Sequence, residues 1–150
     1  MGLDSKLSRY SNPGGRRHSH KDRDLALGLQ QWLKEQGMEL YIDWLDPCMP
    51  DTPDAVTADR IRTATKVVDV FLFLATNDSM VSRWCPWELG FADGVKRNEQ
   101  IAVISTSDAS GNYYGNEYLQ LYRRIDQATA KNSLCWYAKG SWSPQLLTSF

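Results

Sequence analysis

The segment Trp84-Cys85-Pro86-Trp87-Glu88 combines one carboxylate with two indole rings. Trp84 and Glu88 stand four residues apart, which places them on one face of a helix. Glu88 would lie in the first turns of that helix, where the dipole favours a negative charge. A carboxylate beside an aromatic ring can stabilise a cationic transition state, such as the oxocarbenium ion of glycosidic bond cleavage. In a purely structural alternative, Glu88 only marks a helix start and both tryptophans belong to the core.

Other residues could also carry chemistry, and each group has a structural alternative. The run Gly14–Arg17 could cradle a phosphate, but it lacks the lysine and the spacing of a P-loop, which favours a flexible basic segment. His18 and His20 suit polar loop positions better than a catalytic base, because no nucleophile motif accompanies them. Cys85 at a helix start could have a lowered thiol pKa, or it could be buried and inert. The aspartates of Asp43–Asp59 match no EF-hand, which favours a solvated loop over a cation site.

Stretches of helical and β-strand pattern alternate along the chain and must position these residues. The helical stretches have apolar residues at one-face spacing, and the strands are short, apolar and bounded by turn residues. We expect helices over 22–36, 56–68, 84–95 and 117–127, and strands over 39–44, 70–75, 101–104 and 133–138. Gly37 is placed to end the first helix with a positive φ, and Asp54 or Thr57 to cap the second. This order predicts an α/β fold with an open parallel sheet.

The stretch Val70–Ala75 is apolar without interruption, which indicates a central strand that is buried on both faces. Ligands of open α/β sheets bind beyond the carboxyl ends of the strands. In this chain those ends lead into the His18–Lys21 turn, the acidic Asp43–Pro53 loop and the Thr76–Glu88 turn. A functional site is therefore expected where these three segments meet.

Composition excludes several classes of protein. The chain has 150 residues, 42% of them hydrophobic and 23% charged, with a formal net charge of −1. These values predict one globular domain. They argue against a nucleic-acid partner, because no basic excess exists, and against a membrane partner, because the longest apolar run is six residues. Three dispersed cysteines and a polar N-terminus predict a cytoplasmic protein without disulfides, a zinc site or a signal peptide.

The order of these segments resembles a family. The run HSHKDRDLALGLQQWLKEQGMELYIDW, a loop rich in Pro and Asp, VVDVFLFLATNDSMVSRW and then a W-x-x-x-E step resemble a TIR domain. More narrowly, the chain is similar to the stand-alone bacterial TIR proteins of antiphage defence, such as those of Thoeris systems. The likeness covers roughly His18 to Ile104, and the segment YGNEYLQLYRRID also fits the bacterial group.

This resemblance implies a flavodoxin-like fold with a central parallel sheet of about five strands flanked by helices. It also implies an NAD⁺ glycohydrolase or cyclase, with NAD⁺ as substrate and no cofactor or metal. Glu88 would be the essential carboxylate and Trp84 would line the pocket. His18, Ser19 and His20 would form the substrate-contacting loop. Asp43 and Trp44 would open the loop known in the family for self-association, and both would also bind the substrate. The implied partners are NAD⁺, other TIR domains and a downstream effector that is reached by a nucleotide product.

The N-terminus departs from the family pattern. An apolar first strand should precede the His-Ser-x-Lys-Asp step, but those positions read Pro13–Arg17, where a central strand is disfavoured. We therefore divide the chain into a basic, polar lead-in over 1–17, with the first strand unassigned, and a TIR domain over 18–150. Residues 1–23 carry six basic and two acidic groups, in contrast to the acidic remainder.

Two alternative functions remain open at this point. The first is a non-enzymatic TIR–TIR interaction module that signals by assembly, with the basic N-terminal segment and the acidic loop in contact between copies. The second is an enzyme similar to nucleoside deoxyribosyltransferases, which use a related fold and a glutamate nucleophile. Salt-sensitive self-association without NAD⁺ turnover would favour the first alternative, and transfer of a base between deoxynucleosides would identify the second.

Overall fold

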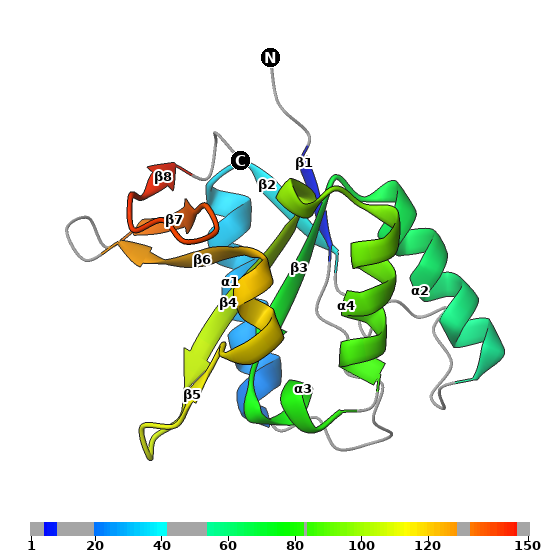
Figure 1. Cartoon of the computed structure of the whole chain (residues 1–150), viewed down its shortest axis with the longest axis horizontal. Helices are drawn as coiled ribbons and strands as arrows, with labels where there is room; N and C mark the ends of the chain where they lie inside the picture. Colours follow the sequence, from blue (N-terminus) through cyan, green and yellow to red (C-terminus); the bar gives the residue numbers. More distant parts are fainter. Residues whose placement is uncertain (1–4, 9–19, 42–53, 83, 129–132, 147–150) are drawn as a thin grey trace.

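Five parallel strands form the centre of the sheet in the computed structural model, which describes residues 5–8, 20–41, 54–82, 84–128 and 133–146. Their order across the sheet is β2-β1-β3-β4-β6, which is the flavodoxin-like arrangement (Figure 1). The expected α/β fold with about five parallel strands is therefore confirmed. The strands are β1 (Ser5–Ser8), β2 (Met38–Tyr41), β3 (Val70–Ala75), β4 (Ile101–Ser107) and β6 (Arg123–Ala128).

Strand β3 lies at the centre of the packing, as its unbroken apolar sequence predicts. All six of its residues are buried. Leu72 and Leu74 belong to the apolar cluster on one face of the sheet, and Phe71 and Phe73 to the cluster on the other. Alternation along the strand thus fills two separate layers of core.

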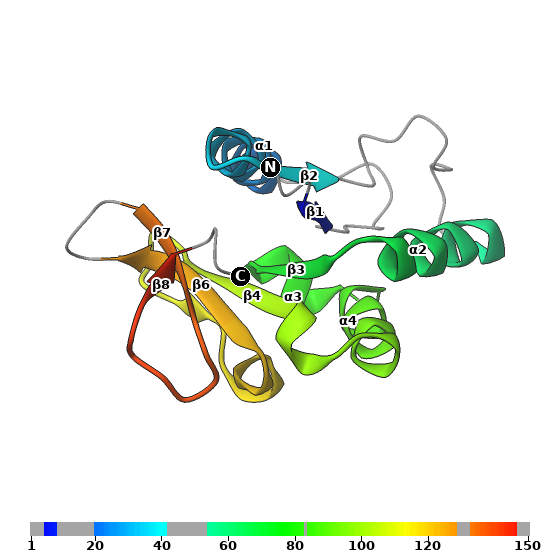
Figure 2. The ribbon, with the colours of Figure 1, turned by 90° about the horizontal axis from the view of Figure 1, so that it is seen from above.

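Helix α1 (His20–Glu35) covers one face of this sheet, and the helices α3 (Asn77–Val81) and α4 (Trp84–Val95) lie on the other (Figure 2). Ala26 and Leu33 of α1 are fully buried against Leu72 and its neighbours. Gly37 follows α1 with φ of 79°, which confirms the predicted end of the helix.

Helix α2 (Ala55–Val67) begins at the predicted cap. The carboxylate of Asp54 accepts a hydrogen bond of 2.9 Å from the amide of Thr57, which satisfies one of the unpaired donors of the first turn. Its buried side chains are Thr57, Ile61 and Thr65, whereas the aliphatic side chains of Val56 and Val67 are exposed. The buried face of α2 is therefore shifted by about one residue from the face that its aliphatic residues would predict.

Three antiparallel strands extend the sheet beyond its parallel centre. Strand β7 (Ser133–Tyr137) pairs with β6, and β8 (Gln145–Leu146) pairs with β7. Strand β5 (Tyr113–Tyr114) folds back on β4 as a hairpin. The expected strand over 133–138 is thus confirmed, but it is antiparallel, so the sheet is mixed rather than wholly parallel.

The prediction of a helix over Glu117–Gln127 is wrong. The segment forms a short 3₁₀ helix, η3 (Glu117–Leu121), followed by strand β6, and a second 3₁₀ helix, η2 (Asn98–Gln100), precedes β4. Leu119, Tyr122 and Ile125 repeat every three residues, which imitates a helical stripe. In the structure Leu119 and Tyr122 pack on the α4 face and Ile125 packs on the α1 face, because residues from 123 onward pair with β4.

The first strand lies inside the expected lead-in. Strand β1 occupies Ser5–Ser8 and pairs in parallel with both β2 and β3, so the sheet does not need the Pro13–Arg17 segment as a strand. Residues 9–19 lie outside the described ranges. The division of the chain into 1–17 and 18–150 stays a prediction.

The β4–β5 hairpin contains an acid-sensitive turn. The carboxylate of Asp108 accepts hydrogen bonds from the side-chain amide of Asn112 (2.8 Å), the hydroxyl of Tyr114 (2.8 Å) and the backbone amides of Asn112 and Ser110 (both 2.9 Å). These bonds, that from the Asn112 side chain foremost, lower the pKa of Asp108 from 3.8 to about 2. Because the pKa of Asp108 is lower in the folded hairpin than its ordinary value of 3.8, the ionised carboxylate stabilises the hairpin at pH values above about 4. This stabilisation is lost as the pH falls from about 4 through about 2 and the carboxylate is protonated.

We therefore expect the backbone amide resonances of Ser110 and Asn112 to titrate with a midpoint near pH 2 in NMR spectra. The variant Asp108→Asn should remove this titration, because it removes the ionisable group. A midpoint near 3.8, the ordinary value, would contradict the assigned hydrogen bonds.

None of the helices in the described ranges combines the length and the apolar character that crossing a membrane requires.

Candidate functional site

Helix α4 carries Glu88 on its buried face. The carboxylate side chain is only 2% exposed and lies among the buried residues of the helix, which recur at one-face spacing. Those residues are Cys85, Glu88, Leu89 and Ala92. A carboxylate that has left bulk water interacts more strongly with a nearby positive charge than an exposed one does, because the local dielectric is low.

The start of α4 is fixed by the chain just before it. The hydroxyl of Ser82 accepts hydrogen bonds from the amides of Trp84 (3.1 Å) and Cys85 (3.3 Å), two donors that have no partner within the helix. Pro86 in the first turn lacks only an amide hydrogen that the helix would not use there. Ser82 therefore caps the start of α4. Glu88 lies one turn further in, so it receives less of the dipole effect than a first-turn carboxylate would.

The two tryptophans of α4 are half-buried and have different surroundings. The ring of Trp84 meets the ring of Trp87 edge-on, with centroids 5.3 Å apart. Trp87 also stacks on Phe91 and lies 5.3 Å from the guanidinium of Arg62 on α2. Trp87 thus fixes α4 against α2. Trp84, at the first position of the helix and one turn before Glu88, remains the aromatic candidate for the site.

The carboxyl end of β3 leads into a hydrogen-bonded turn. Thr76 and Ser79 form a capping box, in which the Ser79 amide donates to Thr76 Oγ1 (3.1 Å) and the Thr76 amide donates to Ser79 Oγ (2.8 Å). From β4, the hydroxyl of Thr106 donates to the carbonyl of Ala75 (2.7 Å). This buried network fixes the sheet edge from which α3 and then α4 begin, and a site needs such rigid support.

Only part of the predicted site lies within the described residues. Helix α1 begins with His20 at the same edge of the sheet as α3 (Figure 1), although the side chain of His20 is not described. His18, Ser19, Asp43 and Trp44 lie outside the described ranges, as does most of the Asp-rich loop. Their approach to Glu88 therefore stays a prediction.

The described cysteines and acidic residues give no sign of a second reactive or metal-binding site. Cys85 and Cys135 are buried thiols, as the inert alternative for Cys85 predicts. The ranges that the structure describes contain no group of three or more His, Cys, Asp or Glu side chains that could hold a metal ion.

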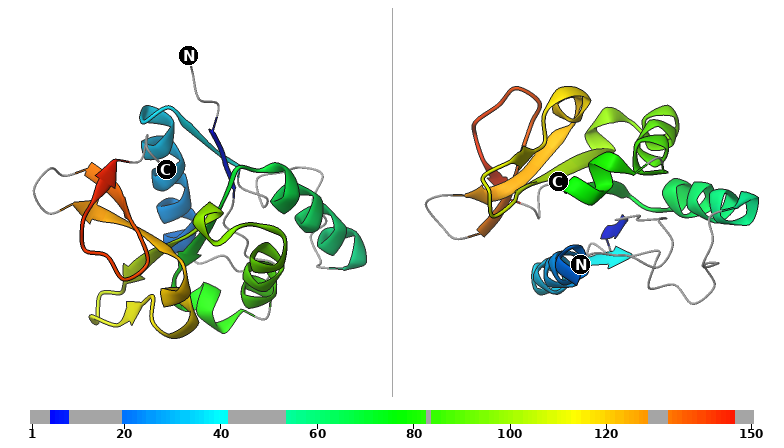
Figure 3. Two further views of the ribbon diagram at one scale, coloured as in Figure 1. Left: turned by 45° about the horizontal axis from the view of Figure 1, so that its top comes forward. Right: turned by 90° about the horizontal axis from the view of Figure 1, so that it is seen from below.

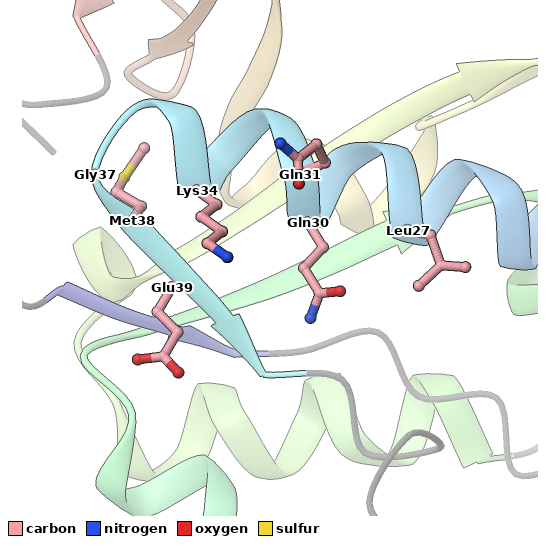
Figure 4. A pocket seen from close by; sticks show the side chains of 7 residues that line it. All are labelled: Leu27, Gln30, Gln31, Lys34, Gly37, Met38 and Glu39. Carbon is pink, nitrogen blue, oxygen red and sulfur yellow. The ribbon is translucent and has the colours of Figure 1, made fainter.

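One cavity, of about 680 Å³, lies between α1 and β2 (Figure 4). Its walls include Gln30 and Lys34 of α1 together with Met38 and Glu39. Met38 and Glu39 are the first residues of β2, so this cavity lies at the amino end of that strand. Ligands of such folds bind at the opposite end.

A second cavity, of about 550 Å³, lies on the face of the sheet opposite α1. It is bounded by β4, by the segment from β5 through η3, by the start of β6 and by the turn after β7. The sequence does not predict this cavity, because these parts are far apart in the chain and because the pattern of 117–127 favours a single helix. The alternation of basic and aromatic residues in Arg123-Arg124, Trp136-Tyr137 and Trp142 was a signal that could have pointed to it.

Comparison with known proteins agrees with this architecture. The family model described as TIR domain matches residues 17–133. The chain is 32% identical over 118 residues to the Probable 3' cyclic ADP-D-ribose synthase ThsB' of Bacillus cereus (strain MSX-D12). That alignment covers 77% of this chain and 61% of the relative, so the chain spans less than two thirds of that relative's length.

Among solved structures, the chain is similar to a crystal structure of a prokaryotic SEFIR domain, with a TM-score of 0.57 and 15% sequence identity. The match covers 84% of this chain and 83% of that one. It shows a shared fold.

Proposed function

Because this chain belongs to the TIR domain family, we propose that it is an enzyme that cleaves the bond between nicotinamide and ribose in NAD⁺. The observation that carries this proposal is the buried carboxylate of Glu88 on α4, one helical turn after Trp84. Helix α4 follows the central strand at the sheet edge where ligands of this fold class bind. The name of the Bacillus cereus relative, a probable cyclic ADP-ribose synthase, supports the same chemistry.

The proposed reaction begins with departure of nicotinamide. The carbon–nitrogen bond breaks and its electron pair moves to the ring nitrogen, so nicotinamide leaves as a neutral molecule. Positive charge develops on the ribosyl carbon and its ring oxygen. The carboxylate of Glu88 would stabilise this cation and accept hydrogen bonds from ribose hydroxyls. The indole of Trp84 would hold the cationic nicotinamide ring before cleavage by a cation–π contact.

The product depends on the group that attacks the ribosyl carbon. Water gives ADP-ribose and a proton. A hydroxyl of the second ribose, or a ring nitrogen of the adenine, gives a cyclic product, and a proton is again released. The name of the Bacillus cereus relative favours the cyclic outcome. Exclusion of water from the site would decide between these routes.

The wider role that we propose follows the TIR resemblance. The nucleotide product would act as a signal to a separate effector during phage infection, and TIR–TIR contacts would assemble the enzyme in the cytoplasm. The basic segment 1–23 and the loop 43–59, which motivated the non-enzymatic assembly module, lie largely outside the described residues. No described contact therefore favours that module over an enzyme.

Incubation of the protein with NAD⁺, with and without a phage lysate, tests the proposal. We expect release of nicotinamide together with an ADP-ribose-derived product, identified by mass. NADH is the matched control substrate, because its dihydronicotinamide carries no positive charge and would have to leave as an anion. Turnover of NADH at the rate of NAD⁺, or no nicotinamide release in any arm, would contradict the proposed chemistry.

A further inference from the structure

The cavity opposite α1 has a positively charged lining. Of the described residues that line it, Arg124 and Lys139 are cationic and none is acidic. Arg124 Nε lies 3.8 Å from the carboxylate of Asp126, an ion pair that is longer than a hydrogen bond. Two cations in one concave surface attract an anionic ligand.

Aromatic rings hold Arg124 in place at this cavity. Its guanidinium lies 4.4 Å from the ring centroid of Tyr137 and 4.9 Å from that of Trp142. Trp142 is nevertheless 83% exposed, which is unusual for a tryptophan. The contact with Arg124 positions this large ring at the rim of the cavity, where it can stack on another planar group.

The remaining walls supply neutral hydrogen-bonding groups. Ser105 of β4, Asn116 before η3 and Gln120 within η3 all line the cavity. Figures 2 and 3 show η3 and the turn between β7 and β8 on the same face of the sheet, with β6 between them. The polar groups of η3 and the cations of β6 and the turn thus surround one space.

The backbone around the cavity is tightly constrained. A Cβ at Gly115 would collide with Ser105 Oγ and would lie 2.8 Å from both Ser105 Cβ and the Tyr113 hydroxyl, so only glycine allows this close approach to β4. Glu117, just after the lining residue Asn116, has φ of 58°, which is uncommon for a non-glycine residue. Such strained positions concentrate at ligand sites. The backbone conformation at Gly115 and Glu117 therefore fixes the shape of this cavity wall.

We propose that this cavity is a nucleotide-binding site, separate from Glu88. Arg124 and Lys139 would bind the phosphates, Trp142 would stack on the base, and Ser105, Asn116 and Gln120 would bind the sugar or the base edge. Its volume of about 550 Å³ suits a ligand of nucleotide size. Two cations suit a phosphate group and an exposed indole ring suits a planar base. A nucleotide carries both groups.

Titration of the ¹⁵N-labelled full-length chain with ADP, inorganic phosphate and adenosine tests this site by NMR. ADP should shift the amides of Ser105, Gly115 and Gly140 and the indole resonance of Trp142, and it should bind more tightly than phosphate or adenosine. ADP contains no nicotinamide–ribose bond, so the result does not depend on NAD⁺ cleavage. Equal affinity for ADP and phosphate, equal affinity for ADP and adenosine, or shifts elsewhere only would overturn the proposal.

Two exposed positions separate the contributions of charge and ring. We expect Lys139→Gln and Trp142→Ala each to weaken ADP binding about tenfold, the effect of losing one phosphate or stacking contact. Trp142→Tyr should restore part of the affinity, because it keeps an aromatic face. Lys34→Gln, which removes an exposed lysine on α1, is the matched control and should bind like the unaltered chain. Unchanged affinity in both Lys139→Gln and Trp142→Ala would also overturn the proposal.

Discussion

Substitution of Glu88 by glutamine is expected to lower the rate of nicotinamide release from NAD⁺ by about 10³-fold, the upper range for loss of one preorganised stabilising group. Glutamine has nearly the same shape as glutamate but no negative charge, and Glu88 is almost fully buried. The substitution therefore removes the charge that would face the ribosyl cation and leaves the packing of α4 in place. Release of nicotinamide under saturating NAD⁺ measures the effect.

The matched control for this variant is Glu99→Gln, which removes an exposed glutamate from η2. It should retain the rate of the unaltered chain. Circular dichroism and thermal unfolding of both variants verify that the fold is kept. If the Glu88→Gln variant turns over NAD⁺ at the unaltered rate, Glu88 is not the essential carboxylate and its role is the structural one.

Substitution of Leu72 by alanine should have the largest effect on stability, lowering the free energy of unfolding by about 3–5 kcal/mol. Leu72 lies in the middle of β3, is 2% exposed and packs in the cluster that includes Ala26 and Leu33 of α1. Its register partner on β4 is Ala102, a small residue that cannot fill the space left behind. A domain of this kind has a total stability of about 5–15 kcal/mol, so the loss would be a large fraction of it.

Urea-induced unfolding measures this loss as a lower midpoint with an unchanged slope. Leu25→Ala on α1 removes the same atoms from a side chain that is about half exposed, so it is the matched control. We expect it to cost less than about 1 kcal/mol. Similar losses in the two variants would contradict the central position of β3 in the core.

Much of the fold could be predicted because local signals and tertiary packing agree. Val70–Ala75 is apolar at every position and is buried at every position. Asp54 and Gly37 have the roles that their types predict, as a helix cap and as a left-handed residue after a helix. In these segments the short-range chemistry of the chain and the final structure favour the same conformation.

The errors occur where pairing partners override the local pattern. Ser5–Ser8 has no run of β-branched residues, yet it pairs with both β2 and β3, and no local signal reveals such partners. Residues 123–128 complete a helix-like spacing, but the free edge of β4 accepts them as a strand. Strand propensity depends on neighbouring strands more than helix propensity does on neighbouring helices.

The candidate sites differ in the same way. The place of Glu88 on a helix behind the central strand could be predicted, because its signal, a carboxylate one turn after a tryptophan behind a buried strand, lies within a few residues. Its role in catalysis stays a prediction. The cavity at Arg124 and Trp142 is assembled from segments between residues 103 and 142, and no short motif encodes it.

The position of β1 also constrains how the chain folds. Leu7 pairs with Val70 across more than sixty intervening residues, so the first strand along the chain lies inside the sheet rather than at its edge. Closing so long a loop has an entropic cost before any contact rewards it. Folding must therefore proceed through non-local contacts, which places this domain among the slower folders of its size. Until β2 or β3 has formed, the first strand has no edge to join.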